Sequence, residues 1–227
     1  MSTQTMNVTL PSSTLYVSGT VNGISTTWTN TKGQTWETVA ERSGNDIYVV
    51  ALTIINSEGV ATEATFTLYY GLHLITDRTQ ADVDYVEQLA AKIQAGTVTE
   101  RELTEWNTMT LKGSYNHTDF NRVGAAMQYV ADRLEEHGYV VIISPKMDWR
   151  EEDCPGWEDT EHYLSALALL RSAFAVLQST PEVPPDMEKL TYVEANNIEK
   201  ILEDIDFLLT NAARAWFYSG EAFSGEV

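Results

Sequence analysis

Seven carboxylates gathered in one stretch of the chain are the first candidates for chemistry. They are Asp148, Glu151, Glu152, Asp153, Glu158, Asp159 and Glu161. A calcium loop needs oxygen ligands at a regular alternating spacing and a glycine that turns the chain, and this stretch has neither. A glycosidase pair is defined only in space, so the sequence leaves that alternative open. We interpret the stretch as a solvated acidic loop.

The other side chains that commonly take part in catalysis are scattered. The four histidines are His73, His117, His137 and His162. None has the spacing of a zinc motif or lies beside a serine or cysteine motif. The single cysteine, Cys154, has no internal disulfide partner and no metal-ligand spacing with a histidine. With no phosphate-binding or dinucleotide glycine motif either, the sequence predicts no enzyme, no metal and no cofactor.

The excess of acidic over basic side chains limits the kinds of partner that the chain can bind. The chain of 227 residues has 14 basic and 33 acidic side chains, a net charge of −19. Residues 1–75 account for −3 and the rest for −16. Nucleic-acid binding through a basic surface is therefore excluded. No signal-like segment and no apolar run of ~20 residues occurs, so we expect no membrane span, synthesis in the cytoplasm, and export only by lysis or within a particle.

The helices of the second part of the chain begin with a helix-start pattern that occurs three times, at Thr79, Asn116 and Thr191. Each copy has an acid three residues on, Asp or Asn five residues on, and apolar residues at seven, eleven and fourteen. The copies are Asp82, Asp84, Val86, Ala90 and Ile93; Asp119, Asn121, Val123, Met127 and Val130; and Glu194, Asn196, Ile198, Leu202 and Ile205. The pattern predicts three capped amphipathic helices, of which only that at Thr191 has a full capping box.

The polar residue at the fifth position is not explained by helix propensity. We expect it to bond the backbone of the preceding turn in each copy. On this hypothesis, replacing Asn121 with Ala loosens the turn at residues 113–118.

The chain divides into two parts with different periodicity. Residues 1–71 alternate in short runs at 8–10, 14–21, 25–29, 48–54 and 64–69, which predicts a small antiparallel β-sandwich. Asp46 and Tyr48 have the spacing that precedes strand F of immunoglobulin-like folds. Residues 72–227 follow a helical period, with helices expected at 79–94, 99–110, 116–137, 157–179 and 191–217. The fold class is thus α+β, an Ig-like β domain followed by an all-α bundle.

Five motifs in the second part occur in a distinctive order. They are LITDRTQADVDYVEQLAAKI, KGSYNHTDFNRVGAAMQYVADRL, MDWREEDCPGWEDTEHYLSAL, LTYVEANNIEKILEDID and AWFYSGEAFSGEV. Together they resemble tail-associated minor structural proteins of phages and prophages of Firmicutes, with DFNRV at the centre. The resemblance implies a virion protein of the tail or baseplate. We expect such a protein to assemble with other virion subunits and with further copies of itself. It transfers no catalytic residue.

Aromatic residues are the candidates for contact with partners. Trp149 and Trp157 lie in an irregular loop, where they could also cap the core. Trp216, Phe217, Tyr218 and Phe223 lie near the end of the chain, in a segment that either docks on a partner or folds back over its own bundle. Tyr139–Ile143 is expected to be a short buried strand or an extended segment. An alternative function is a glycan-binding module in which exposed Trp28 and Trp36 stack on sugars of a host surface.

Overall fold

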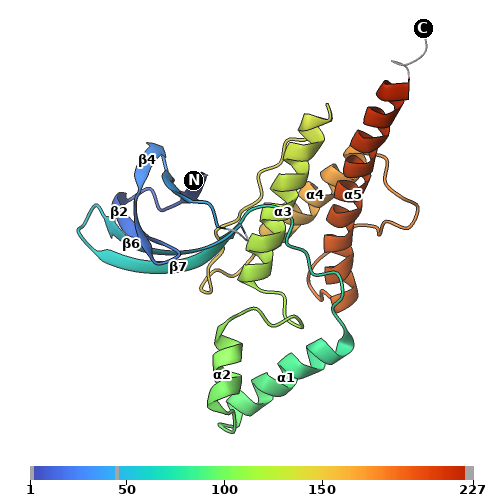
Figure 1. Ribbon diagram of the computed structural model, residues 1–227. Helices are drawn as coiled ribbons and strands as arrows, with labels where there is room; N and C mark the ends of the chain where they lie inside the picture. Colours follow the sequence, from blue (N-terminus) through green and yellow to red (C-terminus); the bar gives the residue numbers. More distant parts are fainter. Residues whose placement is uncertain (1–2, 44–45, 223–227) are drawn as a thin grey trace.

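The computed structural model describes residues 3–43 and 46–222, with side-chain surroundings described through Ala212. Strands fill the N-terminal part and helices the C-terminal part, so the chain is an α+β protein (Figure 1). The strands are β1 (Thr3–Thr9), β2 (Thr14–Val21), β3 (Ile24–Thr27), β4 (Thr29–Lys32), β5 (Thr35–Glu41), β6 (Ile47–Asn56) and β7 (Ala61–Tyr69). The helices are α1 (Gln80–Gln94), α2 (Glu100–Asn107), α3 (His117–Glu136), α4 (Trp157–Ala173) and α5 (Tyr192–Ala222).

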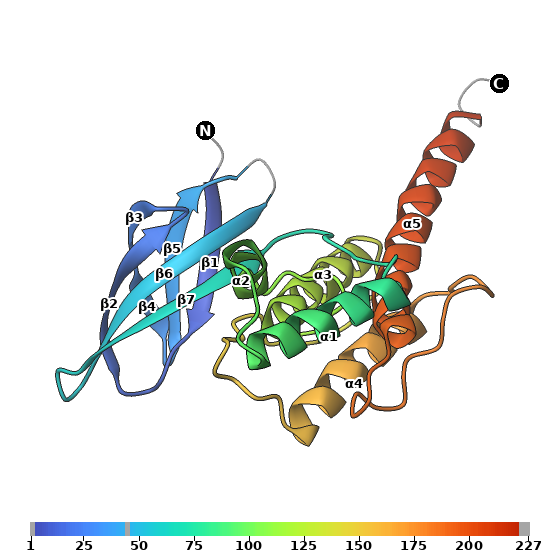
Figure 2. The ribbon, with the colours of Figure 1, turned by 90° about the horizontal axis from the view of Figure 1, so that it is seen from below.

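Two antiparallel sheets form the β part, residues 3–71. Their strand orders are β1-β5-β4 and β3-β2-β6-β7, and Figure 2 shows them as two layers. Val21 pairs with Ile24 across a two-residue turn in which Asn22 and Gly23 have φ of 50° and 78°. Positive φ at both positions is the geometry of the tight hairpin turn that suits strand twist.

Alternate residues of both sheets face one common core. Members of this core from five strands and two connections are Met6, Val8, Leu10, Val17, Val21, Trp28, Trp36, Tyr48, Val50, Leu52, Ile54, Ala64, Phe66 and Leu68. The strands β4 and β5 were not among the predicted runs. Thr35–Glu41 alternates in burial, but its Glu37 and Glu41 made the apolar signal weak.

Helices α3, α4 and α5 share a second core in the helical part, residues 72–222. It includes Val123, Met127 and Val130 of α3, Leu167 and Leu170 of α4, and Ile198, Leu202 and Ile205 of α5. These include the predicted apolar positions of the second and third helix-start patterns. The first pattern differs, because α1 buries only Leu89 and pairs with α2 in an arm away from this core (Figure 1).

The helix starts are capped more completely than the sequence indicated. Reciprocal capping boxes join Thr79 with Asp82 and Asn116 with Asp119, as well as the expected pair of Thr191 and Glu194. The prediction that only the Thr191 copy has a full box is therefore wrong. An Asp at the third helical position reaches back to the cap residue's N–H as Glu does.

Two helices end earlier than expected. Helix α2 ends at Asn107 because Met109 has a φ of 51°, and α4 ends at Ala173 because Phe174 is extended, with its ring against Tyr139 at 5.0 Å between centroids. Tyr139–Ile143 is neither a strand of a sheet nor buried, so the expectation of a buried strand is wrong, whereas its alternating exposure agrees with the other expectation, an extended segment. No helix within the described residues is both long and apolar enough to cross a bilayer.

Candidate functional site

The carboxylates of residues 148–161 do not converge on one point. Asp148 accepts a hydrogen bond from the Thr9 N–H at 3.2 Å, and Asp153 pairs with Lys146 at 2.8 Å. Asp159 accepts from the Gly156 N–H at the start of α4, while Glu151, Glu152, Glu158 and Glu161 are exposed. Across the described residues, no three His, Cys, Asp or Glu side chains are placed to hold a metal ion. These acids serve local contacts and the solvated loop.

Four charged side chains in the helical part form a buried ring. The Arg78 guanidinium lies 3.1 Å from Asp119 and 2.8 Å from Glu199, and that of Arg122 lies 2.7 Å from Asp119 and 2.5 Å from Glu199. The four side chains are at most 9% exposed. Two cations and two anions thus neutralise one another where α3, α5 and the segment that precedes α1 meet.

The ring also fixes the segment that joins the two parts. Glu199 accepts the Ile75 N–H, and Arg122 donates to the His73 carbonyl oxygen. Burial alone lowers the pKa of Arg122, but its hydrogen bonds to Glu199 and Asp119 and their charges raise it above its ordinary value. The guanidinium therefore stays charged at every pH at which the protein is folded.

Sequence reasoning missed this ring. Its only signal was that Arg122 and Glu199 adjoin the apolar positions Val123 and Ile198. Two tyrosines lie beside it, with the Tyr115 and Tyr163 hydroxyl oxygens 2.6 Å apart. Burial raises the pKa of both hydroxyls above the ordinary value, so both remain protonated donors.

The two Asn residues at the fifth position of the helix-start pattern, Asn121 and Asn196, bind backbone groups from distant parts of the chain. The Asn121 amide donates to the Trp149 carbonyl at 2.8 Å and accepts the Trp149 N–H at 2.7 Å. Asn196 makes the same two bonds with Arg78, at 2.9 and 3.0 Å. Asp84 in the exposed arm accepts only from the Gln80 side chain. The hypothesis of a bond to the preceding turn is therefore wrong in all three copies.

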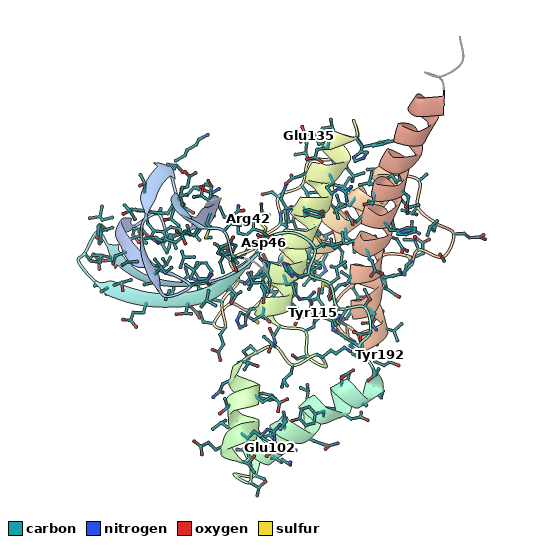
Figure 3. The ribbon with its side chains drawn as sticks, viewed as in Figure 1. Arg42, Asp46, Glu102, Tyr115, Glu135 and Tyr192 are labelled. Carbon is teal, nitrogen blue, oxygen red and sulfur yellow. The ribbon has the colours of Figure 1, made fainter. Side chains whose placement is uncertain are left out.

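A groove runs between the free edge of β1 and the helical part. Asn7 and Met147 line two adjoining pockets of about 710 and 620 Å³. The edge is bridged at both ends, by the Tyr70 hydroxyl donating to the Thr5 carbonyl at 3.2 Å and by Asp148 accepting from Thr9. Figure 3 shows the ion pair of Arg42 and Asp46 at the same junction, 2.9 Å apart. The groove belongs to the contact between the two parts.

The structure places Trp28 and Trp36 inside the β core. Their exposed fractions are 5% and 6%. Stacking on a sugar needs an accessible ring face, so the expectation that these two rings are exposed is wrong. Both lie at inward positions between the sheets, where their large apolar area stabilises the fold instead.

The two loop tryptophans have opposite surroundings. Trp149 is buried and packs against Phe120 at 5.4 Å between ring centroids, with the Lys146 ammonium 4.0 Å from its ring centre. Trp157 is 73% exposed and borders a pocket of about 840 Å³ that Pro155, Pro184 and Met187 also line. Trp149 therefore closes the core, and Trp157 is free for contact.

The remaining interaction candidates lie at the end of α5. Trp216, Phe217 and Tyr218 fall within this helix, whose backbone continues to Ala222, but their side chains lie outside the described surroundings. Phe223 lies outside the described residues altogether. Among the side chains described, which end at Ala212, the last one of this helix in the core is Leu209.

Comparison with known proteins adds no assignment. No family model matches the chain, and no curated protein or solved structure is significantly similar to it.

Proposed function

We propose that this chain is a virion structural protein of a phage or prophage tail or baseplate, made in the host cytoplasm and acting by protein–protein assembly rather than by catalysis. The order of motifs over residues 72–227 supports the proposal. The structural observation that carries it is the free end of α5.

Helix α5 extends well beyond the body of the protein. It has 31 residues, and its C-terminal turns stand clear of every other element in both views (Figures 1 and 2). An isolated helical segment of about 12–15 residues or fewer is marginal in water. A projecting helix whose sequence contains Trp216, Phe217 and Tyr218 is therefore suited to packing against another subunit.

We also propose that the β part is an Ig-like sandwich, whose described strands correspond to all but the first strand of that topology. The orders β1-β5-β4 and β3-β2-β6-β7 correspond to B-E-D and C′-C-F-G of the Ig topology. Tyr48, at the start of β6, is fully buried and its hydroxyl accepts the Ser43 N–H at 2.9 Å. This is the contact of a tyrosine corner before strand F. By the same reasoning, we propose that α3, α4 and α5 form a helical bundle around their shared core.

The test is mass spectrometry on density-purified particles induced from the source strain. We expect the full chain at the stoichiometry of a tail component, and we expect a variant that ends at Ala212 to be missing from particles. The melting temperature of this variant should stay within about 4 °C, because the backbone of the removed turns stands clear of the other elements (Figures 1 and 2). A variant that lacks only residues 223–227 is the matched control.

Three outcomes would contradict parts of this proposal. Absence of the full chain from intact particles removes the virion function. Wild-type incorporation of the Ala212 variant removes the docking role of α5. A large fall in melting temperature for that variant shows that the segment folds against its own protein.

A further inference from the structure

The segment that follows α3 has the form of a strand without a sheet. Residues 140–147 alternate strictly between exposed and half-buried side chains, which is the period of an extended chain. Val140 and Ile142 are 73% and 87% exposed, while Val141 and Ile143 pack against the core of the helical part. Five consecutive residues, Tyr139–Ile143, are aromatic or β-branched, the types that favour strands.

Within the described part of the chain, the backbone from Val140 to Ile143 is unpaired. The Tyr139 N–H donates to the Leu134 carbonyl at 2.9 Å, but no residue from Val140 to Ile143 has a hydrogen-bond partner within the described part of the chain. Peptide N–H and C=O groups in an extended segment are complementary to another extended backbone. The exposed side of residues 140–143 thus combines free backbone hydrogen-bonding groups with apolar side chains.

The segment is held in place before any partner binds. Its start is fixed by the bond to Leu134 at the end of α3, and its continuation is fixed by Asn121, which binds Trp149 through two hydrogen bonds. It also lies close against α3, since a Cβ on Gly124 would be only 3.0 Å from the Lys146 carbonyl oxygen. A preorganised edge loses little conformational entropy on binding.

We propose that the strip Tyr139–Ile143 is a dimerisation edge that pairs antiparallel with the same strip of a second copy. Two-fold pairing about Val141 places Val140 of each copy opposite Ile142 of the other, so the two exposed β-branched side chains meet. The register applies to the extended residues alone, since Glu136 ends α3 and Lys146 pairs with Asp153 of its own copy. Figure 3 shows Glu135, the neighbour of Glu136, at the end of α3 from which the segment starts.

The lack of charged residues in this strip favours contact between two copies of an acidic chain. No charged residue occurs from Gly138 to Pro145, in a chain of net charge −19. Two acidic surfaces repel, so an uncharged, self-complementary edge is where identical copies approach at least cost. The inference concerns the purified protein and does not depend on the virion function.

The experiment is sedimentation equilibrium of the full chain over a concentration series, for wild type, Ile142→Lys and Ile24→Lys. Ile24 is the matched control because it is also an isoleucine in an extended segment and is 62% exposed. We expect wild type to dimerise and Ile142→Lys to raise the dimer dissociation constant at least about tenfold, because each new Lys replaces the apolar contact with Val140 of the other copy and the two introduced like charges become diagonal neighbours across the strand pair. Ile24→Lys should leave it within about twofold.

Hydrogen exchange gives an independent result on the same samples. Alternate amides within residues 140–142, those on the paired edge, should exchange more slowly as wild-type concentration rises, and should not do so in Ile142→Lys. A wild type that stays monomeric to about 1 mM overturns the proposal, since even this limit corresponds to weak association. An equal effect of the two substitutions, or exchange at residues 140–142 that is independent of concentration, also overturns it.

Discussion

The buried ring of Arg78, Arg122, Asp119 and Glu199 makes each member depend on the others. Each carboxylate contacts both guanidinium groups, so the removal of one charge leaves another without compensation. We predict that Glu199→Gln lowers the free energy of unfolding by about 3–5 kcal/mol, the cost of breaking a buried ion pair. Urea denaturation monitored by circular dichroism measures this difference.

Glu203 provides the comparison for that substitution. It lies one turn further along α5 and pairs with Lys200 at 2.7 Å, with its side chain 45% exposed. Glu203→Gln should therefore change the free energy of unfolding by less than about 1 kcal/mol. Equal effects of the two substitutions would show that the ring contributes no more than a surface ion pair.

Asn121 has a role that a single substitution can separate from helix capping. Because its amide binds both backbone groups of Trp149, we predict that Asn121→Ala speeds hydrogen exchange at the Trp149 amide and costs about 1–3 kcal/mol of stability. Exchange at residues 113–118 should change no more than global stability requires. Asp84→Ala, in the exposed copy of the pattern, should leave both regions unaltered. Faster exchange confined to 113–118 would restore the earlier hypothesis.

Helix starts are the elements whose stability should depend on pH. A side-chain hydrogen bond from Lys92, followed by backbone and side-chain bonds from Thr99, lowers the pKa of Glu102 from 4.5 to about 2. Hydrogen bonds to Thr79 and Thr191 also lower the pKa of Asp82 and Glu194. A carboxylate with a lowered folded pKa stabilises the fold above its ordinary pKa, and the contribution is lost as pH falls through the folded value.

We predict that the first turn of α2 frays as pH falls from 4.5 to about 2, the interval between the two pKa values of Glu102. The measurement is a titration of backbone amide shifts at residues 99–103. In Glu102→Gln the same amides should show no such titration, because the group no longer ionises. A transition centred at the ordinary pKa would show that the Lys92 and Thr99 contacts are absent in solution.

Local elements could be predicted from sequence because their determinants are local. At Thr79, Thr99, Asn116 and Thr191 the capping residue and its partner acid lie within four residues of sequence. The structure confirms these helix starts. The partners of Asn121 and Asn196 are 28 and 118 residues away in sequence. Neither hydrophobic periodicity nor helix-capping rules indicate such a partner. The buried ring and the paired Asn contacts could therefore be identified only from the three-dimensional structure. Burial of Trp28 and Trp36 likewise depends on which face of a sheet is covered.

At the scale of the whole molecule, the joining segment fixes the β part to the helical part. Residues 73–78 are held by Arg122, Glu199 and Asn196, and α3 lies against β7 (Figure 2). The helical part nevertheless has most of the negative charge, since residues 76–227 have a net charge of −16. Any assembly of this chain with itself must overcome that repulsion.

Salt should therefore strengthen self-association through the strip Tyr139–Ile143. Its backbone and apolar side chains are uncharged, so added ions screen the repulsion between two copies without weakening the pairing. The Debye length falls from ~30 Å at 0.01 M to ~8 Å at 0.15 M salt, whereas an exposed ion pair contributes only ~0–1 kcal/mol. We predict a lower dimer dissociation constant at 0.15 M than at 0.01 M NaCl, measured by sedimentation equilibrium. A dissociation constant that rises with salt would mean that flanking charges, and not the strip, hold the copies together.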